Sequence, residues 1–261
     1  MPWRKTKDPY KILVSEVMLQ QTQVARVLLK YKEFLREFPT LRSLAKASDK
    51  KLLKAWQGLG YWKRALALKN TAKTILKEYK GRFPKDPNTL QTLPGIGPYT
   101  ARALACFAFE HREAFLDTNI RQVYLHCFFL GKKNISDKQI LRIGHKVISS
   151  ISRHSSGLRY PRITSREWHY ALFDYGAMVL KDKKINKQSK HYTKQSKFAG
   201  SFRSFRTKVM HFLLDQPKQT ATTSKLKLIL KKEESPYAPE KILASLEKDG
   251  LIKKKQNYYT L

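Results

Sequence analysis

The sequence is poor in cysteine, in acidic residues and in long apolar runs. Its two cysteines, Cys106 and Cys127, cannot supply a four-thiolate zinc or iron–sulfur site, and both lie in apolar runs typical of buried free thiols. No run approaches the roughly 18 apolar residues of a membrane span, and the first residues lack the apolar core of a secretory signal. These absences predict an intracellular protein, in the cytoplasm or at the nucleoid, that has no membrane partner.

The shortage of acids leaves a large positive charge. The 261 residues include 53 lysines and arginines against 20 aspartates and glutamates, a formal net charge of +33. An enzyme that acts on small molecules has no need of so large a positive charge, and the repulsion between like charges destabilises a compact fold. A nucleic acid is therefore the simplest partner. Because 41% of the residues are apolar, the chain is not a disordered basic tail and can bury a core.

Apolar residues recur at helical spacing through the first 180 residues, without an alternating strand of useful length. We therefore predict an all-α fold there, with helix N-caps at Asp49, Thr100, Ser136 and Ser165. Residues 181–197 hold seven lysines and are predicted to form a loop.

Residues 198–261 are apolar enough to form a second globular part. The pattern predicts helices over 202–215, 222–232 and 239–249, followed by two short strands that flank a turn at Gln256-Asn257. This order is similar to a winged-helix module, a relative of the helix-turn-helix that often binds DNA. A small packing domain or a partner-docking module is the alternative.

A glycine-rich hairpin is the sharpest local motif, and it reads Leu93-Pro-Gly-Ile-Gly-Pro-Tyr-Thr-Ala101. Gly95 and Gly97 allow a tight turn that opens a helix at Thr100. Backbone N–H groups there can bind a phosphate without reading base sequence. The motif resembles the hairpin of a helix-hairpin-helix, and the alternative is an ordinary turn between helices.

Two carboxylates stand out from their surroundings. Glu16 interrupts the apolar run from Ile12 to Leu19, where burial would raise its pKa and make it a proton donor near neutral pH. A solvated or lysine-paired Glu16 at the helix rim is the alternative. Asp117 follows an apolar run and can cap a helix starting near Asn119, which would keep it ionised. An acid and an ionised carboxylate are the pair that glycoside hydrolysis needs.

Two further segments, Gln20-Gln21-Thr22 and Leu59-Gly60-Tyr61-Trp62, carry amides and aromatic rings at predicted helix ends. Such side chains can wedge into a stack of bases. Tyr61 and Trp62 could equally belong to the core.

Taken together, these segments resemble the helix-hairpin-helix (HhH-GPD) DNA glycosylases, and within them the MutY-type adenine glycosylases. The resemblance runs from Pro2 to about Leu180. It is carried by Pro2-Trp-Arg4, Ser15-Glu-Val-Met-Leu-Gln-Gln-Thr22, Gly58-Leu-Gly-Tyr61, Leu93-Pro-Gly-Ile-Gly97, Leu116-Asp-Thr-Asn119 and Asp174-Tyr-Gly-Ala177. It implies two helical subdomains flanking a cleft within residues 1–180, followed by the lysine-rich loop at 181–197 and the winged-helix-like domain at 198–261.

The resemblance also implies a reaction. Such an enzyme flips an adenine mispaired with 8-oxoguanine or guanine out of the duplex and hydrolyses its N-glycosidic bond. Glu16 matches the general acid that protonates adenine N7, and Asp117 the carboxylate that stabilises the oxocarbenium ion. Asn119 and Tyr99 match residues that support Asp117. Because lyase relatives carry a lysine where Tyr99 stands, we expect a monofunctional glycosylase.

The same resemblance assigns the binding residues. Gln21 is expected to fill the base stack and Tyr61 to wedge beside the opposite base, while Trp3 and Arg4 border the base pocket. The remaining expected DNA contacts are Gln20, Gly95, Gly97 and Thr100. The expected partner is double-stranded DNA with a mismatch or an oxidised base, bound by a monomer.

The sequence departs from the pattern in several places. The cysteine positions of the family's [4Fe–4S] loop read Leu180, Lys187, Lys190 and Ser196, so no cofactor is expected beyond a monovalent cation at the hairpin. The two lysines would then contact phosphate, or simply solvate the loop.

Two other departures concern specificity. The resemblance does not extend to the family's large 8-oxoguanine-sensing C-terminal domain, so recognition of the opposite base stays open. Tyr170 stands where relatives often place a Gln or Glu that reads adenine. The alternatives are therefore a glycosylase for another base, such as thymine opposite guanine, and a non-catalytic DNA-binding protein on this scaffold.

Overall fold

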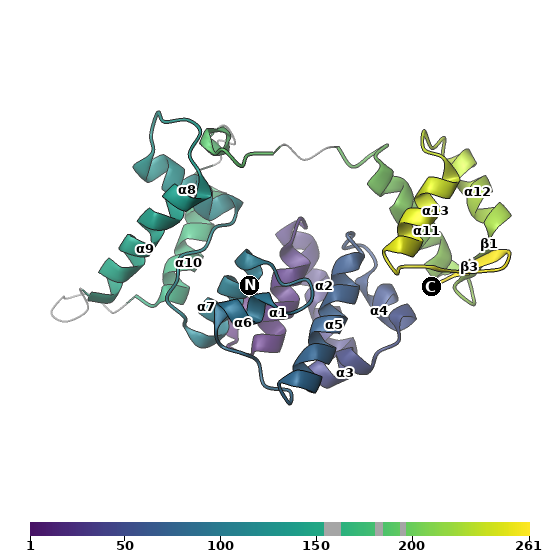
Figure 1. Ribbon diagram of the computed structural model, residues 1–261, viewed down its shortest axis with the longest axis horizontal. Helices are drawn as coiled ribbons and strands as arrows, with labels where there is room; N and C mark the ends of the chain where they lie inside the picture. The colour runs from purple at the N-terminus through teal and green to yellow at the C-terminus, as the bar shows by residue number, and fades with distance from the viewer. Residues whose placement is uncertain (154–162, 181–184, 194–196) are drawn as a thin grey trace. The chain divides into compact units, whose positions relative to one another are not determined.

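The computed structural model describes residues 1–153, 163–180, 185–193 and 197–261 (Figure 1). Helices dominate, as the periodicity predicts, and the all-α expectation is confirmed apart from a small sheet near the C-terminus. The elements of the first part are η1 (Pro2–Lys5), α1 (Pro9–Leu19), α2 (Val24–Glu37), α3 (Leu41–Lys46), α4 (Asp49–Trp56), α5 (Lys63–Glu78), α6 (Pro87–Gln91), α7 (Pro98–Phe109) and α8 (Thr118–Phe128). The later elements are α9 (Asp137–Arg153), α10 (Ser165–Asp174), η2 (Tyr175–Val179), η3 (Ile185–Gln188), α11 (Phe202–Asp215), β1 (Thr220–Thr222), α12 (Thr223–Lys232), α13 (Pro239–Lys248), β2 (Lys253–Lys255) and β3 (Tyr258–Thr260).

These elements form two compact units that interleave along the chain. The first unit comprises Met1–Glu16 and Phe83–Lys194, and the second comprises Val17–Arg82 and Gln195–Leu261. The units do not coincide with the sequential division at 1–180, 181–197 and 198–261. The second unit joins a stretch before the glycine hairpin to a stretch at the C-terminal end of the chain.

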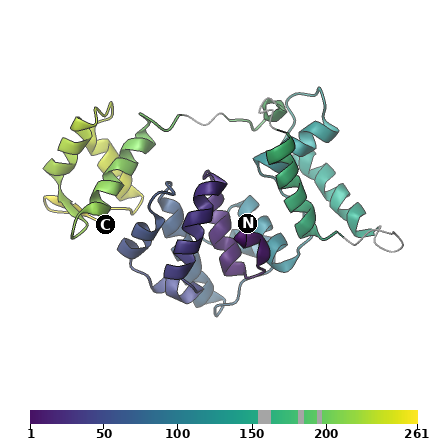
Figure 2. The same cartoon turned by 180° about the vertical axis from the view of Figure 1, so that it is seen from behind.

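The first unit is built around α7 and α8. Helix α7 is almost entirely apolar and buries most of its length, as expected for a helix that is surrounded by protein. It packs against α6 through the hairpin, while α8 packs against α9, α10 and the π-helical turn η2 (Figures 1 and 2). The η2 contact depends on Gly176, because a Cβ there would lie 2.5 Å from the carbonyl oxygen of Asn119.

The second unit contains the amphipathic helices α2–α5. Helix α2 buries Val27, Tyr31 and Phe34 at spacings of four and three residues, which places them on one face. Phe34 contacts the edge of Trp56 from α4, with ring centroids 5.7 Å apart. These aromatic rings form the core that the sequence periodicity predicts.

Residues 198–261 of the second unit form a small helical module with a sheet. Helices α11, α12 and α13 pack on one another, and an antiparallel sheet of order β1-β3-β2 includes the hairpin that turns at Gln256-Asn257. The predicted helices and the terminal hairpin are all present. Strand β1, which the sequence did not suggest, pairs with β3 from Thr220↔Thr260 to Thr222↔Tyr258. Its three residues are too short to show an alternating pattern.

Several local predictions need correction. The caps of α4, α7 and α10 are Ser48, Gly97 and Thr164 rather than Asp49, Thr100 and Ser165. Each lies one to three residues earlier than predicted. A polar residue beside a cap is easily mistaken for it, because both can bond to the first-turn N–H groups.

The two cysteines also differ from one another. Cys106 is buried and Cys127 is exposed, so only one of the expected buried thiols is buried. Burial raises the pKa of the Cys106 thiol to about 12, which makes it unreactive. Within the described ranges, no helix is long and apolar enough to cross a bilayer.

We expect Gly176→Ala to destabilise the first unit. The added methyl group would overlap the Asn119 carbonyl, so either η2 or the start of α8 must move, at a cost of about 1–3 kcal/mol. Thermal unfolding should show a fall in Tm of several degrees. Gly97→Ala is the control, because a Cβ there meets nothing within 4 Å and its φ is −84°. Equal losses in the two variants would contradict the close contact.

Candidate active site

Glu16 lies in the buried, mainly apolar part of α1. The residue is 5% exposed, and its neighbours Ser15 and Val14 are fully buried. Desolvation raises the pKa of the carboxyl to about 7, while a hydrogen bond from Tyr99 and the charge of Arg4 act in the opposite direction. The interpretation of Glu16 as a solvated rim residue is therefore wrong. A carboxyl in this environment can donate a proton at neutral pH.

Asp117 is held at the N-terminus of α8. Its Oδ1 accepts a hydrogen bond of 2.7 Å from the backbone N–H of Ile120, and its Oδ2 accepts one of 3.2 Å from the side-chain amide of Asn119. The predicted cap is thus present, one residue before the helix begins at Thr118. Burial nevertheless raises the pKa of Asp117, against the lowering effect of these hydrogen bonds and of Arg121.

Glu16 and Asp117 are close enough to interact electrostatically. The negative charge of Asp117 contributes to the raised pKa of Glu16, because two carboxylates in a buried space disfavour simultaneous ionisation. The arrangement therefore favours one protonated and one ionised carboxyl, with Glu16 as the proton donor.

The family resemblance implies that Tyr99 supports Asp117, but in the structure Tyr99 contacts Glu16. Its hydroxyl donates a 3.0 Å hydrogen bond to Oε2 of Glu16, whereas Asp117 is supported by Asn119. The Tyr99 ring lies edge-on to Phe115, with centroids 5.7 Å apart. Burial and the two carboxylates keep the pKa of the phenol well above its usual value, so Tyr99 remains a donor.

Arg4 and Tyr170 form the polar border of this site. The guanidinium of Arg4 makes a bidentate ion pair with Asp174, with N–O distances of 2.7 and 2.8 Å, and lies 4.6 Å from the centroid of the Tyr170 ring. Tyr170 stacks on Phe107 with centroids 4.5 Å apart. Trp3 is buried, and its ring therefore belongs to the core beneath the border rather than to its surface.

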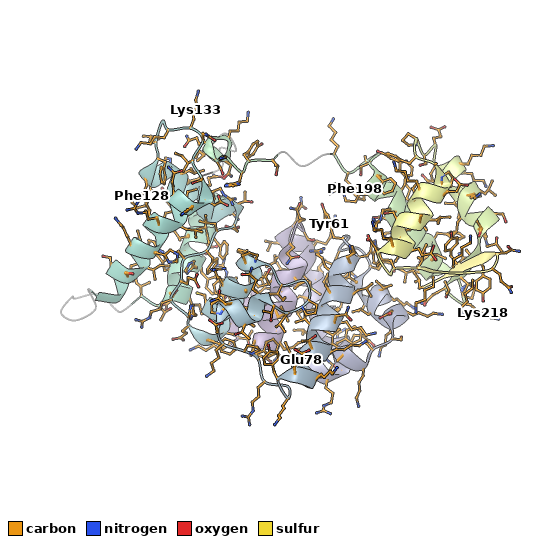
Figure 3. The ribbon with its side chains drawn as sticks, viewed as in Figure 1. Tyr61, Glu78, Phe128, Lys133, Phe198 and Lys218 are labelled. Atoms are coloured by element: carbon orange, nitrogen blue, oxygen red, sulfur yellow. The ribbon has the colours of Figure 1, made fainter. Side chains whose placement is uncertain are left out.

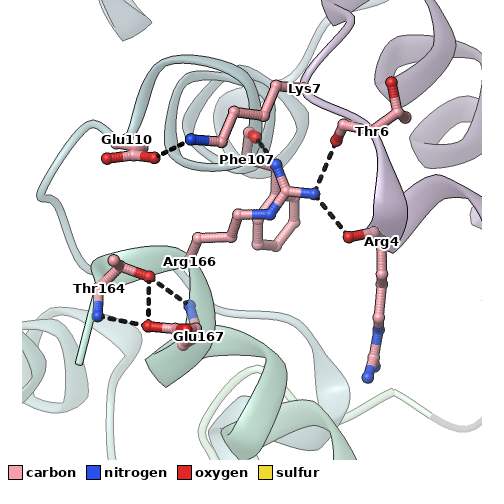
Figure 4. A network of polar contacts seen from close by, with 8 residues as sticks. All are labelled: Arg4, Thr6, Lys7, Phe107, Glu110, Thr164, Arg166 and Glu167. Atoms are coloured by element: carbon pink, nitrogen blue, oxygen red, sulfur yellow. Dashed lines mark hydrogen bonds and ion pairs between the residues drawn. The ribbon is translucent and has the colours of Figure 1, made fainter. Parts of the chain in front are cut away.

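Arg166 fixes the segment that carries Trp3 and Arg4, and sequence analysis did not identify it. Its guanidinium donates to the backbone carbonyls of Arg4 (2.8 Å), Thr6 (2.7 Å) and Phe107 (Figure 4). Arg166 is only 8% exposed. In a chain with 53 cationic residues, no sequence signal distinguishes a buried arginine from a solvated one.

The glycine hairpin has the expected backbone. Gly95 adopts φ +75°, a conformation that L side chains rarely adopt, and Gly97 caps α7. Gly97 has no side chain that could cap α7, and a helix N-terminus of this kind can bind an anion. Thr100 lies inside the helix with its side chain buried, so any DNA contact at this position would come from its backbone alone.

The second unit holds the two predicted wedge segments, and Arg64 joins them. Gln21 and Tyr61 both adopt positive φ, of 58° and 45°. The guanidinium of Arg64 donates to oxygens on both segments and at the end of α1. Its acceptors are the carbonyls of Val17, Met18, Gln20, Leu59, Gly60 and Tyr61 and the hydroxyl of Thr22.

The exposure of the wedge residues shows which of them can contact a ligand and which belong to the core. Gln21 is exposed, while Gln20 and Tyr61 are half-buried, so each can present part of its side chain to a ligand. Trp62 is buried and belongs to the core. Burial lowers the pKa of Arg64 to about 10, which still leaves it charged at neutral pH.

Residues 14–150, which include Glu16, Asp117 and the hairpin, match the HhH-GPD superfamily of base excision DNA repair proteins. The chain belongs to this superfamily. It is 36% identical over 179 residues to an adenine DNA glycosylase of Buchnera aphidicola, and 39% identical over 180 residues to one of Mycobacterium tuberculosis. Each match covers 69% of this chain, and 48% and 56% of the two relatives, so the chain spans about half the length of the curated relatives it matches.

Solved structures show the same fold. A thermostable thymine-DNA glycosylase superposes with a TM-score of 0.58 at 24% identity, covering 72% of this chain and 86% of that one. An endonuclease III trapped as a covalent intermediate with DNA gives a TM-score of 0.54 at 21% identity, covering 67% and 76%. The HhH-GPD architecture expected from the sequence is confirmed.

The residues do not fit the iron–sulfur cluster that many HhH-GPD proteins carry. Leu180, Lys187 and Lys190 offer no thiolate, and Ser196 lies outside the described residues. Among the described residues, no group of three or more His, Cys, Asp or Glu side chains gathers around a common point.

Hydrogen bonds hold residues 185–193, the described part of the corresponding loop. Asn186 donates to the Gln122 side chain at 2.9 Å, and Ile135 exchanges backbone bonds of 2.9 Å with Gln188 and Lys190. These residues are therefore fixed to α8 and to Ile135. Asn186 and Ser189 are buried in it, while Lys187 and Lys190 are exposed.

We expect Glu16→Gln to change the pH dependence of stability. A folded-state pKa of about 7, above the ordinary 4.5, means that the folded protein holds a proton which the unfolded chain releases between these values. Ionising Glu16 therefore costs stability as the pH rises, by about 3 kcal/mol in total at 1.36 kcal/mol per pKa unit.

Chemical denaturation at pH 4 and pH 8 checks this. Relative to the parent, Glu16→Gln should gain roughly 3 kcal/mol in free energy of unfolding between the two pH values. Glu78→Gln, at an exposed position on α5 (Figure 3), is the control and should show a much smaller change. A parent–variant difference that is the same at both pH values would contradict the burial of an ionisable Glu16.

Proposed function

We propose that the chain is a monofunctional DNA N-glycosylase that removes adenine mispaired with 8-oxoguanine or guanine. The observation that carries the proposal is the pair of buried carboxyls, Glu16 with a pKa of about 7 and Asp117 at the cap of α8. Membership of the HhH-GPD superfamily and the adenine DNA glycosylases among its relatives support the choice of base.

The proposed reaction begins with an adenine flipped into the site of the first unit. Glu16 donates its proton to N7 of the base, so the base leaves as a neutral species rather than an anion. The positive charge that develops on the sugar is stabilised by the Asp117 carboxylate, which Asn119 and the N–H of Ile120 hold in place. Water then adds its oxygen to C1′, and its proton passes to a carboxylate of the pair.

Tyr99 supports the absence of a lyase step. A Schiff base requires an amine, and Tyr99 presents a phenol whose pKa is raised and which hydrogen-bonds to Glu16. Its bond lowers the pKa of Glu16, so in this proposal Tyr99 tunes the acid rather than attacking the sugar.

The remaining parts of the proposal concern the partner. The chain would act as a monomer on double-stranded DNA, holding phosphate at the N-terminus of α7 with no cofactor other than a monovalent cation at the hairpin. Gln21 would fill the space that the flipped base leaves, and Tyr61 would wedge beside the opposite base. Arg64 holds the segments of both residues through Thr22 and Leu59.

We expect Glu16→Gln to abolish base release while duplex binding stays nearly unchanged. The amide has almost the shape of the carboxyl but cannot donate the proton, and loss of a general acid typically costs about 10²–10⁴-fold. Single-turnover assays should use adenine opposite 8-oxoguanine, guanine and cytosine, together with thymine opposite guanine. In the parent, the rate should fall as the pH rises through about 7, because Glu16 loses its proton there.

Each outcome of this panel decides something different. Adenine release at the parental rate by Glu16→Gln would remove Glu16 as the acid. Release of thymine opposite guanine, without release of adenine, would identify another substrate. No release of any base at enzyme excess would indicate a non-catalytic DNA-binding protein.

We expect the double change Lys187→Gln and Lys190→Gln to weaken binding to all duplexes by a similar factor. Removing one lysine–phosphate interaction should reduce the slope of log K against log salt by about 0.9. The control is Lys73→Gln with Lys77→Gln, two exposed lysines on α5 that carry the same charge. An equal reduction in the control would mean that only the overall field matters, and weakening confined to lesion-bearing DNA would make the loop part of recognition.

A further inference from the structure

Three consecutive residues, the last two of the turn before α5 and the first of α5 itself, contact the C-terminal module of residues 198–261. The guanidinium of Arg203 donates to the Tyr61 hydroxyl and lies 5.1 Å from the centroid of its ring. Trp62 meets His211 edge-to-face at 5.7 Å, and Nζ of Lys63 lies 3.0 Å from Oδ1 of Asp249. A hydrogen bond, an aromatic contact and an ion pair thus join one short segment to α11 and to the end of α13.

Tyr61 needs such support because its backbone is in an unfavourable conformation. Its φ of 45° is uncommon for a bulky side chain and persists only where the surroundings impose it. Arg64 lies 5.4 Å from the centroid of the Tyr61 ring, and Arg203 contacts the same ring from α11. The ring is therefore held by one arginine of the adjoining helix α5 and by one of the module.

The same residues border a pocket within the second unit. Its volume is about 470 Å³, in the range of small-molecule sites. Gln21, Gly60 and Tyr61 line it from the wedge segments, and Phe198, Arg203 and His211 line it from the module (Figure 3 labels Tyr61 and Phe198). Phe198 is exposed and can offer a flat apolar face, while Thr207 and His211 add polar groups that can meet a base edge.

We propose that α11 braces the Tyr61 turn and completes a subsite for the unpaired base opposite the one that is removed, with Arg203 as the positioning residue. This inference rests on the proposed function. The module then positions the Tyr61 side chain, which enters the base stack, and does not read DNA sequence on its own. Its occupant is a nucleobase with a stacking face and a polar edge, which guanine and 8-oxoguanine share.

Arg203→Met tests the positioning role, because methionine keeps much of the apolar stem but loses the donor and the charge. At saturating enzyme, the rate of adenine release should fall about tenfold or more, as expected for a misplaced group. The preference among guanine, 8-oxoguanine and cytosine as opposite base should shrink towards one, with little change in binding to undamaged duplex. Arg203→Lys should restore part of both quantities.

Lys208→Met is the matched control on the same helix. Lys208 is paired with Glu233 and does not line the pocket, and the change removes one positive charge in the same way. It should leave the rate and the opposite-base preference at parental values. The positioning role is wrong if Arg203→Met matches Lys208→Met in both measurements.

A double-mutant cycle with Tyr61→Phe tests the contact itself. Removing the hydroxyl should lower the rate several-fold in the parent and have almost no further effect in Arg203→Met, because the hydrogen bond is already absent there. Equal effects in the two backgrounds would show that the residues act independently and would overturn the proposal.

Hydrogen exchange separates this inference from the proposed function. The amides of residues 58–63 in the DNA-free protein should exchange faster in Arg203→Met than in the parent or in Lys208→Met, whatever reaction the protein performs. Unchanged exchange would overturn the brace even if the parent releases adenine. If Arg203→Met exchanges faster but the parent protein releases no base, the brace is supported and the proposed function is rejected. Melting temperatures of all variants show whether the module stays folded.

Discussion

The site depends on the burial of one carboxyl group. Glu16 is placed on an apolar stretch of α1, so water cannot stabilise its charge, and its pKa rises to about 7. The surrounding groups act within that constraint. Tyr99 gives the carboxylate one hydrogen bond, Arg4 adds a positive charge, and Asp117 adds a negative one. Without the apolar surroundings, Glu16 would be an ordinary ionised surface residue of a very basic protein.

Two arginines, Arg166 buried and Arg64 half-buried, organise the segments around this chemistry. Arg166 binds backbone carbonyls on both sides of the site border, and Arg64 binds carbonyls at the end of α1 and in the turn before α5. A guanidinium is suited to this task because its five donors lie in a fixed plane. These two of the 53 lysines and arginines bind backbone carbonyls at helix ends and in turns.

Backbone strain occurs where the wedge side chains are presented. Gln21 and Tyr61 both have positive φ, and both belong to segments that Arg64 holds. Strained conformations of this kind need several restraints at once. The C-terminal module adds contacts to Tyr61, Trp62 and Lys63, so the second unit depends on two stretches that lie far apart in the sequence.

Local sequence patterns predict the helical class, the hairpin, the cap at Asp117 and the helices of the C-terminal module, and the structure contains all of them. These predictions follow from local periodicity and from glycine conformation, which depend on neighbouring residues alone. Only contacts in the folded protein show that Glu16, Thr100 and Trp62 are buried and that Tyr99 contacts Glu16. The same holds for the hydrogen bonds that Arg64, Arg166 and Arg203 make to distant segments. The tertiary structure also decided the pairing of β1 with β3 and the interleaving of the two units. These features depend on contacts between residues far apart in the chain, and burial and pKa depend on the complete set of neighbours, which no local pattern contains.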